Sequence, residues 1–361
     1  MIGTQKVALV VDALAGIGGA EKVLMSAMEL VPEAPIYTLV YNRKAFLGTP
    51  IAARQVIPSY IEKLPGARLH YRKYLPLMPR AIERFDLSRF DLILSFSYAV
   101  AHGVRLQNGQ KHLSYTFTPM RYAWRNFGIN GSEQTANVWT QRLFELFRRW
   151  DSAVVTRVER FASVSRWISD WIREVYQRES TVIYPPVDIE RFSPEMVRGD
   201  YFITINRLVA HKRIDLIVKA FNRLHLPLLV VGEGPERQKL EQMAEPNVRF
   251  LGYLPDEAVA DLLSRARAYI CAGEEDFGIS LVEAQAAGCP VIAYRKGGAL
   301  ETVCEGQTGL FFNKPSFESL TETVEYFSRQ ANDFDPRQIA ASVQRFNKLR
   351  FLQEFASFEM G

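Results

Sequence analysis

The sequence predicts an α/β protein made of two doubly wound domains, each with a parallel sheet between layers of helices. Its 361 residues are enough for two domains, and a hydrophobic content of 48% supplies a core for each. Short apolar runs alternate with amphipathic helical stretches along the whole chain, which is the pattern of parallel sheets covered by helices. The alternation stops once, at the proline-rich segment Tyr184–Pro194, and then starts again.

The first half contains a series of predicted buried strands, most of them followed by a helix. The N-terminal run MIGTQKVALVVDAL is interrupted by Asp12, and no small-residue cleavage site follows it, so we interpret it as a strand and not as a leader. The strands are predicted at Lys6–Asp12, Ile36–Tyr41, Asp91–Ser95, His112–Tyr115, Arg160–Ser163 and Thr181–Ile183.

The segment YPPVDIERFSP is predicted to be a hinge, because its prolines forbid helix and hold the preceding residues extended. We therefore predict a first domain at residues 1–188, a second at 189–340, and a helix at 341–361 that crosses back to the first domain. Strands of the second domain are predicted at Tyr201–Asn206, Pro227–Val231, Val248–Phe250, Ala268–Cys271 and Pro290–Tyr294.

Charge and cysteine content argue against several classes of protein. The chain has 44 basic and 40 acidic residues, a balance that does not indicate a nucleic-acid-binding protein. Its cysteines, Cys271, Cys289 and Cys304, have neither the spacing of a zinc site nor that of a disulfide framework, so we expect reduced thiols in a cytoplasmic protein. No stretch approaches the roughly 20 apolar residues that span a bilayer, so any membrane contact is expected to be peripheral.

The most informative segment is EEDFGISLVEAQAAGCPVIA, a polar loop that leads into a helix. Gly278, Ile279 and Ser280 stand at the helix start, where free amides and the helix dipole attract a diphosphate. Glu275 before them and Glu283 after them have carboxylates suited to sugar hydroxyls and ribose. For an isolated pair of this kind, an equal alternative is that Glu275 caps the helix and Glu283 is a solvated side chain.

The segment INRLVAHKR tips this balance, because it puts Arg207 and Lys212 after the first strand of the second domain. Cations at that edge can neutralise a diphosphate leaving group. Other transferases use a divalent ion held by Asp-x-Asp at a strand end, and no such pair follows a predicted strand here. Arg207 and Lys212 are then expected to replace a metal, although taken alone they would more often be surface charges.

Glycine-rich turns follow other predicted strands. In DALAGIGGAEKVL, Gly18 and Gly19 let the backbone approach a phosphate, but Glu21 stands where the dinucleotide fingerprint needs glycine, so the match to a dehydrogenase fails. VGEGPE, with Gly232, is a similar turn in the second domain. In LGYLPDE, Leu254 and its neighbours are expected to meet a nucleobase through backbone atoms.

Together, GGAE, the Arg207 and Lys212 pair, VGEGPE, GYLPDE and the Glu275 to Glu283 element resemble glycosyltransferase family 4. LPLMPRAIERFD, SFSYAVAHGV, TPMRYAW and YPPVD are similar to the subset that builds exopolysaccharides, so the resemblance covers essentially the whole chain. It implies the GT-B fold, with two Rossmann-like domains facing a central cleft. It also implies retaining, metal-independent hexosyl transfer by a front-face route without a protein nucleophile.

The resemblance also implies roles for residues. Arg207 and Lys212 hold the diphosphate and Glu275 orients the sugar hydroxyls, which makes these three the expected catalytic residues. Glu283 binds the ribose, and Gly19 contacts phosphate or sugar across the cleft. The full expected donor-binding set is Gly18, Gly19, Gly232, Leu254, Phe277, Gly278, Ile279, Ser280 and Glu283.

One position departs from the family. Relatives often have a histidine before the Thr-Pro of TPMRYAW, whereas this chain has Phe117, which cannot donate a hydrogen bond. Either catalysis depends more on Arg207 and Lys212, or His102 approaches the site, or activity is weakened or lost. A lone histidine is more often structural.

The acceptor side is expected to include Phe117, His102 and the planar or aromatic groups of Arg121, Tyr122 and Trp124. Interdomain packing is an equal alternative for the last three. Between residues 63 and 84 basic residues interleave with Tyr, Leu and Met, as at an anionic membrane surface; a solvated basic helix is the alternative.

The leading hypothesis is a cytoplasmic hexosyltransferase at the inner face of the plasma membrane, in polysaccharide biosynthesis. UDP-glucose is the first candidate donor and GDP-mannose the second, with no other cofactor. The expected acceptor is a saccharide or a polyprenyl-diphosphate-linked sugar, and no nucleic-acid partner is expected. The alternatives are a donor-binding scaffold without turnover, suggested by Phe117, and a sugar-nucleotide epimerase.

Overall fold

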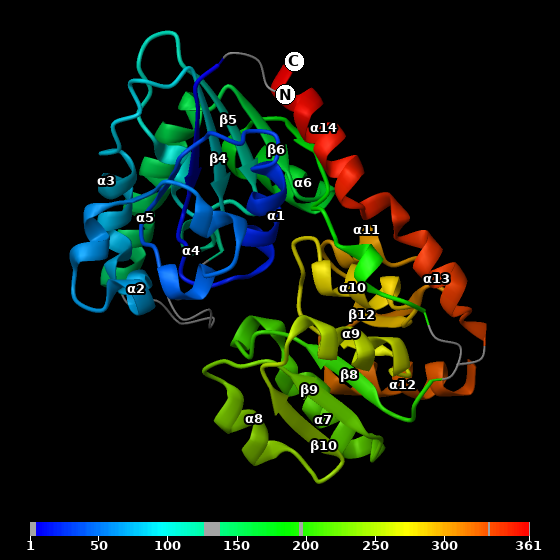
Figure 1. The fold of residues 1–361 in the computed structure, drawn as a ribbon. Coiled ribbons are helices and arrows are strands. Elements are labelled where there is room, and N and C mark those ends of the chain that lie inside the picture. Colours follow the sequence, from blue (N-terminus) through cyan, green and yellow to red (C-terminus); the bar gives the residue numbers. More distant parts are fainter. Residues whose placement is uncertain (1–4, 126–137, 195–197, 331–332, 361) are drawn as a thin grey trace. The chain divides into compact units, whose positions relative to one another are not determined.

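The computed structural model describes residues 5–125, 138–194, 198–330 and 333–360. The chain forms two compact units (Figure 1). Unit 1 comprises residues 1–186 and 349–361, and unit 2 comprises residues 187–348. Within the described ranges, no helix has both the length and the apolar content to cross a bilayer.

Unit 1 is built on a sheet whose seven described strands are all parallel, in the order β3-β2-β1-β4-β5-β6-β7. The central strand β4 and its neighbour β1 are fully buried, as expected for a parallel sheet with helices on both faces. The strands are β1 (Val7–Val11), β2 (Ile36–Thr38), β3 (Val56–Pro58), β4 (Leu92–Ser97), β5 (Lys111–Thr116), β6 (Arg160–Ser163) and β7 (Ser180–Val182).

The helices of unit 1 are α1 (Gly19–Ala27), α2 (Ala67–His70), α3 (Met78–Ile82), α4 (Arg121–Trp124), α5 (Val138–Val154), α6 (Arg166–Tyr176) and α14 (Lys348–Met360). The last of these is far from the others in sequence, yet its residues from 349 onward belong to this unit. Phe351 and Phe355 of α14 are buried and pack edge to face against Tyr115 of β5.

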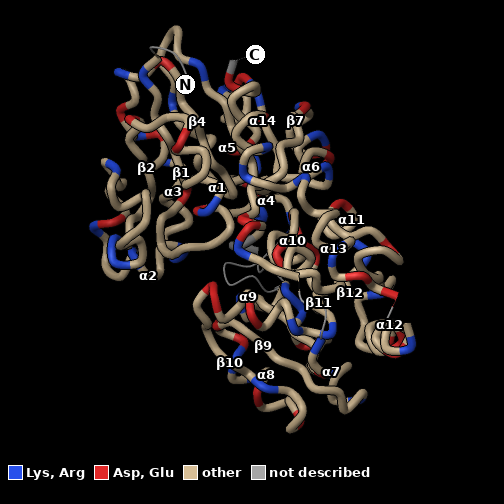
Figure 2. The backbone as a smooth tube through the Cα atoms, turned by 45° about the vertical axis from the view of Figure 1, so that its right-hand side comes forward, with Lys and Arg blue, Asp and Glu red and all other residues tan. Residues whose placement is uncertain are grey.

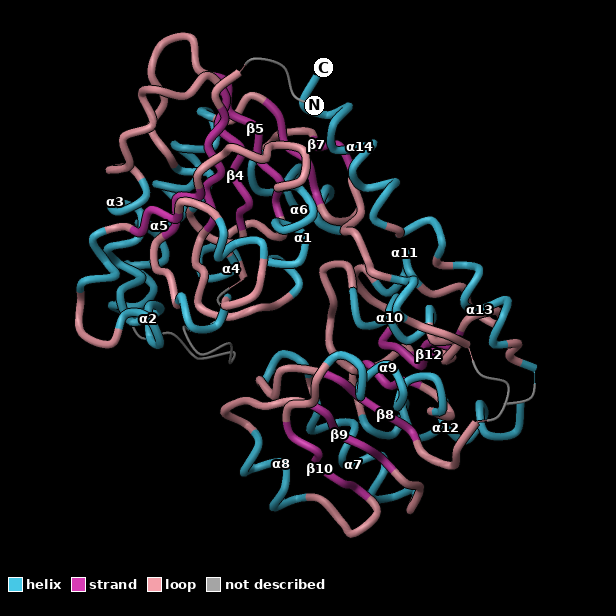
Figure 3. Tube along the Cα trace, viewed as in Figure 1, coloured by secondary structure: helices cyan, strands magenta, loops and turns pink. Residues whose placement is uncertain are grey.

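Unit 2 has a second parallel sheet, with the described strands in the order β10-β9-β8-β11-β12-β13. Figure 3 draws its strands in magenta and labels β8, β9, β10 and β12. The strands are β8 (Phe202–Ile205), β9 (Leu228–Val231), β10 (Val248–Gly252), β11 (Tyr269–Cys271), β12 (Val291–Tyr294) and β13 (Gly309–Phe312). The helices are α7 (Ile214–Leu224), α8 (Arg237–Met243), α9 (Asp256–Arg265), α10 (Ile279–Ala286), α11 (Ala299–Thr302), α12 (Phe317–Gln330) and α13 (Pro336–Ser342).

The predicted α/β class with two doubly wound parallel sheets is confirmed. In each sheet the order in which the chain adds strands reverses once. The reversal lies between β1 and β4 in unit 1 and between β8 and β11 in unit 2. Ligands of open α/β sheets bind outside the carboxyl ends of the strands at such a switch point. The loops after these four strands are therefore where a site is expected.

In unit 1 the switch point is organised by Asp12, directly after β1. Its buried carboxylate accepts hydrogen bonds from the backbone N–H groups of Tyr98, Ala99, Val100 and Ala101, at donor–acceptor distances of 2.6 to 3.0 Å. The loop after β4 is thus folded around a side chain from the end of β1.

Candidate functional site

The strongest polar contact at the switch point of unit 2 joins Lys212 and Glu275. Lys212 Nζ donates to both carboxylate oxygens of Glu275, at 2.6 and 2.7 Å. The side chains are only 22% and 9% exposed. Burial alone would lower the pKa of Lys212, but the adjacent Glu275 carboxylate outweighs this effect and raises it, so the ammonium stays charged.

Cys271, the last residue of β11, lies behind this pair. Its thiol is 3.6 Å from Oε1 of Glu275, and burial together with the Glu275 charge raises the pKa of the thiol. Cys271 is therefore a protonated neighbour that donates to the carboxylate. All three cysteines of the chain are free.

Helix α10 begins beside this pair. Gly278 caps it with φ 91°, in the left-handed region that favours glycine, and a Cβ there would lie 2.5 Å from Cδ1 of Leu281. The amides of Ile279 and Ser280 stand in the first turn, where the helix has no earlier carbonyl to accept them. Phe277, just before the cap, is 3% exposed and packs edge to face on Phe346.

Tyr269 connects the start of α10 to the end of β8. Its hydroxyl oxygen is 3.0 Å from the carbonyl oxygen of Ile205 and 3.0 Å from Oγ of Ser280. Ile205 is the last residue of β8, so the phenol joins this strand end to the first turn of the helix.

The glycine turn after β9 packs backbone to backbone on the loop after β8. A Cβ on Gly232 would lie 1.9 Å from the carbonyl oxygen of Asn206, and one on Gly234 would lie 2.2 Å from that of Leu208. Leu208 N–H donates to the carbonyl of Glu233 at 2.9 Å. Only glycine permits this approach, so the sequence VGEGPE fixes the loop that carries Arg207 and Lys212.

Arg207 itself is exposed in this loop. Its guanidinium has no hydrogen bond or ion pair with any residue that the structure describes. The loop backbone is held by the turn after β9, and the exposed guanidinium at the carboxyl edge is available to an anionic ligand. Leu254 is half-buried in the loop between β10 and α9.

Glu283 is held by a side chain that sequence reasoning missed. Its Oε1 accepts from Nη2 of Arg191 at 3.2 Å, and Arg191 also pairs with Asp256 of α9. Both Arg191 and Glu283 are less than one fifth exposed. Arg191 therefore fixes the position of the carboxylate predicted to bind ribose.

In unit 1, Gly18 and Gly19 lie where predicted, as the cap and first residue of α1. The Gly18 N–H donates to Oε2 of Glu21 at 2.8 Å. Burial raises the pKa of Glu21 to about 7, and the nearby Asp12 carboxylate adds to this effect. Glu21, which argued against a dinucleotide fingerprint, thus accepts a hydrogen bond from the N–H of the cap residue Gly18 through its side chain.

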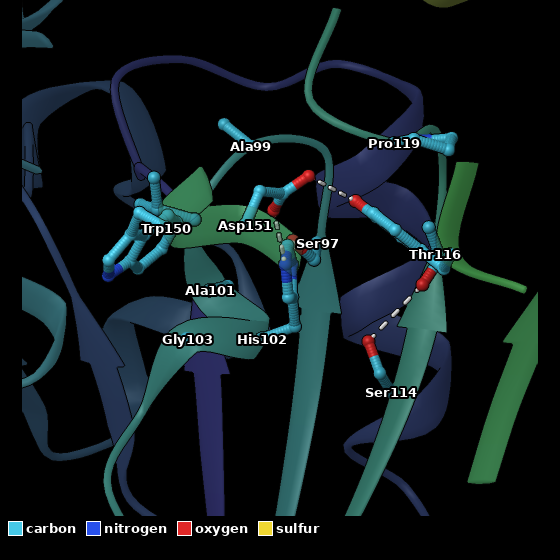
Figure 4. Close-up of polar contacts among 12 residues, drawn as sticks. Ser97, Ala99, Ala101, His102, Gly103, Ser114, Thr116, Pro119, Trp150 and Asp151 are labelled. Atoms are coloured by element: carbon cyan, nitrogen blue, oxygen red, sulfur yellow. Dashed lines mark hydrogen bonds and ion pairs between the residues drawn. The ribbon is translucent and has the colours of Figure 1, made fainter. Parts of the chain in front are cut away.

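His102, which was predicted on the acceptor side, is a buried side chain, and its role there stays a prediction. The ring is 2% exposed, with Nδ1 2.9 Å from Oγ of Ser97 and Nε2 2.8 Å from Oδ1 of Asp151 (Figure 4). The second oxygen of Asp151 accepts from Trp124 Nε1 and from the Tyr176 hydroxyl. His102 belongs to a buried hydrogen-bond network, as the structural alternative holds, and Trp124 joins the same network through its indole.

The remaining acceptor-side residues lie near the carboxyl end of β5. Phe117 follows the strand, is half-buried, and packs edge to face on Tyr115. Arg121 and Tyr122 begin α4 and are half-buried. The structure thus keeps Phe117, Arg121, Tyr122 and Trp124 together in one short stretch of unit 1.

Comparison with known proteins shows which solved structures share this fold. Solved structures with the GT-B fold are similar to this chain over almost their whole length. Sucrose-phosphate synthase from Thermosynechococcus elongatus has a TM-score of 0.78 at 17% identity, covering 99% of this chain and 98% of that chain. Anabaena HepE in complex with UDP and glucose has a TM-score of 0.72 at 16% identity, covering 99% and 100%. The fold is therefore GT-B.

Residues 188–341 match the family described as Glycosyl transferases group 1. A GDP-mannose-dependent alpha-(1-6)-phosphatidylinositol monomannoside mannosyltransferase of Mycolicibacterium smegmatis is 32% identical over 187 residues, which are 44% of this chain and 48% of the relative. Mannosylfructose-phosphate synthase of Agrobacterium fabrum is 28% identical over 174 residues, 40% and 38% of the two chains. The matched part spans less than half the length of these curated relatives.

The predicted GT-B fold is thus confirmed, and residues 188–341 are similar to group 1 glycosyltransferases. Family 4 and its exopolysaccharide subset stay predictions. Across the described ranges, no group of three or more His, Cys, Asp or Glu side chains is arranged to hold a metal ion.

Proposed function

We propose that this chain transfers a hexose from a nucleotide diphosphate sugar to a saccharide or lipid-linked acceptor, with retention at the anomeric carbon. The observation that carries the proposal is the buried Lys212–Glu275 pair beside the open end of α10, within the residues that are similar to group 1 glycosyltransferases. A fixed cation and free amides at one strand edge suit a diphosphate, and the adjacent carboxylate suits sugar hydroxyls.

The chemistry would divide among these groups as follows. Lys212 and Arg207 neutralise the charge that grows on the diphosphate as the glycosidic bond to the sugar breaks. Glu275 accepts hydrogen bonds from the hexose, and Glu283, held by Arg191, accepts them from the ribose. The released phosphate oxygen takes the proton of the attacking acceptor hydroxyl, so no protein nucleophile is required.

For the donor, the names of two curated relatives that are 32% identical favour GDP-mannose. UDP-glucose, the first candidate from sequence reasoning, is the second choice. The GT-B neighbours, which are less than 20% identical, speak only to the fold.

The test is release of nucleoside diphosphate from each donor, measured with acceptor saccharides and membrane lipid extracts. Lys212→Ala should lower the turnover number about 100-fold, because its charge matters most as the phosphate leaves. Lys219→Ala, an exposed lysine of α7 in the same unit, is the matched control and should keep full activity. A Lys212→Ala enzyme with unchanged turnover contradicts the assignment. Tight donor binding by the wild type without release of nucleotide favours the scaffold, and interconverted donor without glycosidic product favours the epimerase.

The metal-free route has its own test. Transfer should continue after divalent ions are removed with EDTA, because fixed cations take the place of a metal ion. Activity that EDTA abolishes and magnesium restores would refute this part of the proposal.

We also propose that unit 1 contacts an anionic membrane surface through residues 63–84, which include α2 and α3. Leu69 and Leu77 of this segment are 73% and 39% exposed. The only acid in it, Glu83, is paired with Arg157 at 2.9 Å. Figure 2 marks the basic residues around α2 in blue. The exposed cations are Lys63, Arg68, Lys73, Arg80 and Arg84.

Cosedimentation with vesicles tests this contact. The double substitution of Leu69 and Leu77 by serine should weaken binding to phosphatidylglycerol vesicles about tenfold or more, since each leucine would lose apolar burial. Leu349→Ser, at a leucine of α14 that is 64% exposed, is the control. Equal binding to neutral phosphatidylcholine vesicles, or no loss in the double variant, would overturn the proposal.

A further inference from the structure

The buried hydroxyl of Tyr269 contacts the end of β8 and the first turn of α10, which both border the proposed site. Tyr269 begins β11 and its side chain is 0% exposed. The hydroxyl oxygen lies 3.0 Å from both the Ile205 carbonyl oxygen and Oγ of Ser280. Burial raises the pKa of this phenol well above its ordinary value, so it keeps its proton.

Counting protons fixes the direction of both hydrogen bonds. A phenol has one proton and a carbonyl has none, so the Tyr269 hydroxyl must donate to Ile205. The second contact is then a hydrogen bond from the Ser280 hydroxyl to the Tyr269 oxygen. The hydroxyl proton of Ser280 is therefore committed inward, and the group that Ser280 offers to an anion is its backbone N–H.

These bonds join the two halves of the proposed diphosphate site. Ile205 is the residue from which the loop with Arg207 and Lys212 departs. Ser280 is in the first turn of α10, whose amides form the other half. A change at the Tyr269 hydroxyl would therefore alter the separation between the cations and the helix end.

We propose that Tyr269 is a positioning residue for the leaving diphosphate, and that Ser280 binds that group through its backbone N–H and not its hydroxyl. This inference rests on the proposed function. Tyr269 touches no substrate, and it acts by holding the loop after β8 and the start of α10 at a fixed separation. Electrostatic stabilisation of a leaving group depends on such preorganisation.

Tyr269→Phe is the variant that tests the proposal, because it keeps the buried ring and removes only the hydroxyl. The kcat for transfer should fall about tenfold or more, and the Kd for GDP or UDP, measured by calorimetry, should rise about tenfold. The KM for acceptor should stay within about twofold of the wild-type value, since the predicted acceptor-side residues belong to unit 1.

Tyr201→Phe is the matched control. Tyr201 lies in the same unit, and its hydroxyl likewise donates to a main-chain carbonyl, that of Leu262, at 2.8 Å. It precedes β8 and so lies at the amino end of that strand, away from the loops of the site. Tyr201→Phe should leave kcat and nucleotide affinity unchanged, and equal losses in the two variants would mean that Tyr269 is only structural.

Ser280→Ala tests the proton count separately, because it keeps the backbone N–H. Its affinity for GDP or UDP should fall no further than that of Tyr269→Phe, and the double variant should match Tyr269→Phe, because both substitutions remove the same Tyr269–Ser280 hydrogen bond. Losses that add in the double variant would mean that the Ser280 hydroxyl acts apart from Tyr269, as a phosphate ligand, and would overturn this part. A Tyr269→Phe enzyme with wild-type kcat and Kd overturns the whole inference. If the wild type binds neither nucleotide and transfers nothing, the proposed function fails and this inference fails with it. If the wild type transfers but the variants do not show these losses, the inference fails and the proposed function stands.

Discussion

Removing either partner of the Lys212–Glu275 pair should destabilise unit 2 strongly, whereas removing both should cost far less than the sum. Lys212→Met leaves a carboxylate that is 9% exposed without its cation, and breaking a buried pair in this way typically costs about 3 to 5 kcal/mol. We therefore expect a loss of about 3 kcal/mol for Lys212→Met. Glu275→Gln leaves the ammonium of Lys212 unpaired, and because this group is 22% exposed and keeps some water, the expected loss is about 2 kcal/mol. The double variant leaves no buried unpaired charge, so a loss of about 2 kcal/mol and a coupling energy of about 3 kcal/mol are expected.

The tryptophans of the chain provide a way to separate the two units. All five occur within the first 171 residues and hence in unit 1, so tryptophan fluorescence follows unit 1 in urea, while far-UV circular dichroism follows both units. The substitutions should shift the circular dichroism transition and leave the fluorescence transition in place. Lys219→Met, at an exposed position of α7, should shift neither.

The pH dependence sharpens this test. A lysine whose pKa is raised on folding contributes stability that is present at lower pH and is lost only as pH rises through the folded value. The coupling energy should therefore be the same at pH 6 and pH 8. A coupling energy below about 1 kcal/mol, or one that disappears between these pH values, would refute the reasoning that the pair is buried and charged.

Three further predictions concern single side chains. Gly232→Ala should destabilise unit 2 by about 3 kcal/mol or more in the urea titration, because its φ is 128° and the new Cβ would lie 1.9 Å from a carbonyl oxygen. The control Gly306→Ala, with φ 75° and open space around it, should cost only about 1 kcal/mol. Glu21→Gln should flatten the pH dependence of unit 1, measured by tryptophan fluorescence: a carboxyl whose pKa rises from 4.5 to about 7 on folding costs stability as pH increases from 5 to 8, by at most about 3 kcal/mol at ~1.4 kcal/mol per unit. Asp151→Asn should lower the stability of unit 1 by about 3 kcal/mol, because one buried carboxylate accepts from His102, an indole and a phenol; a shift of less than 1 kcal/mol in the fluorescence transition would show that the network is dispensable.

Sequence reasoning located most strands and missed two, β3 and β13. Both are edge strands, and each pairs on one side only. β3 is the three-residue run Val56–Pro58, where proline is tolerated because an edge strand needs fewer ladder hydrogen bonds. β13 starts with Gly309, where a Cβ would lie 2.0 Å from the Val291 carbonyl oxygen, so the glycine reflects close packing and not a turn. Composition alone cannot separate such short segments from loops.

Part of the candidate site could be predicted from the sequence, and part could not. The positions of Lys212 and Glu275 after two strands were enough to predict one shared edge, because carboxyl ends of parallel strands lie together. Their direct ion pair, and the roles of Tyr269 and Arg191, could not be predicted. A tyrosine in an apolar strand has the pattern of a core residue, and only the structure shows that its hydroxyl meets Ile205 and Ser280.

The loops at this edge contact one another through their backbones, and this fixes where the charges stand. A Cβ on Gly273 would lie 3.0 Å from the His211 carbonyl oxygen, one on Gly297 would lie 2.4 Å from that of Glu275, and one on Gly298 would lie 2.4 Å from Cα of Phe277. The loops after β8, β11 and β12 therefore leave no room to slide past each other. Under the proposed function, loops held in this way would need little reorganisation when a diphosphate binds, which is the condition for electrostatic stabilisation of a leaving group. Under the proposed function, these glycines, which have no chemistry of their own, help to set how well the cations of this edge stabilise a departing diphosphate.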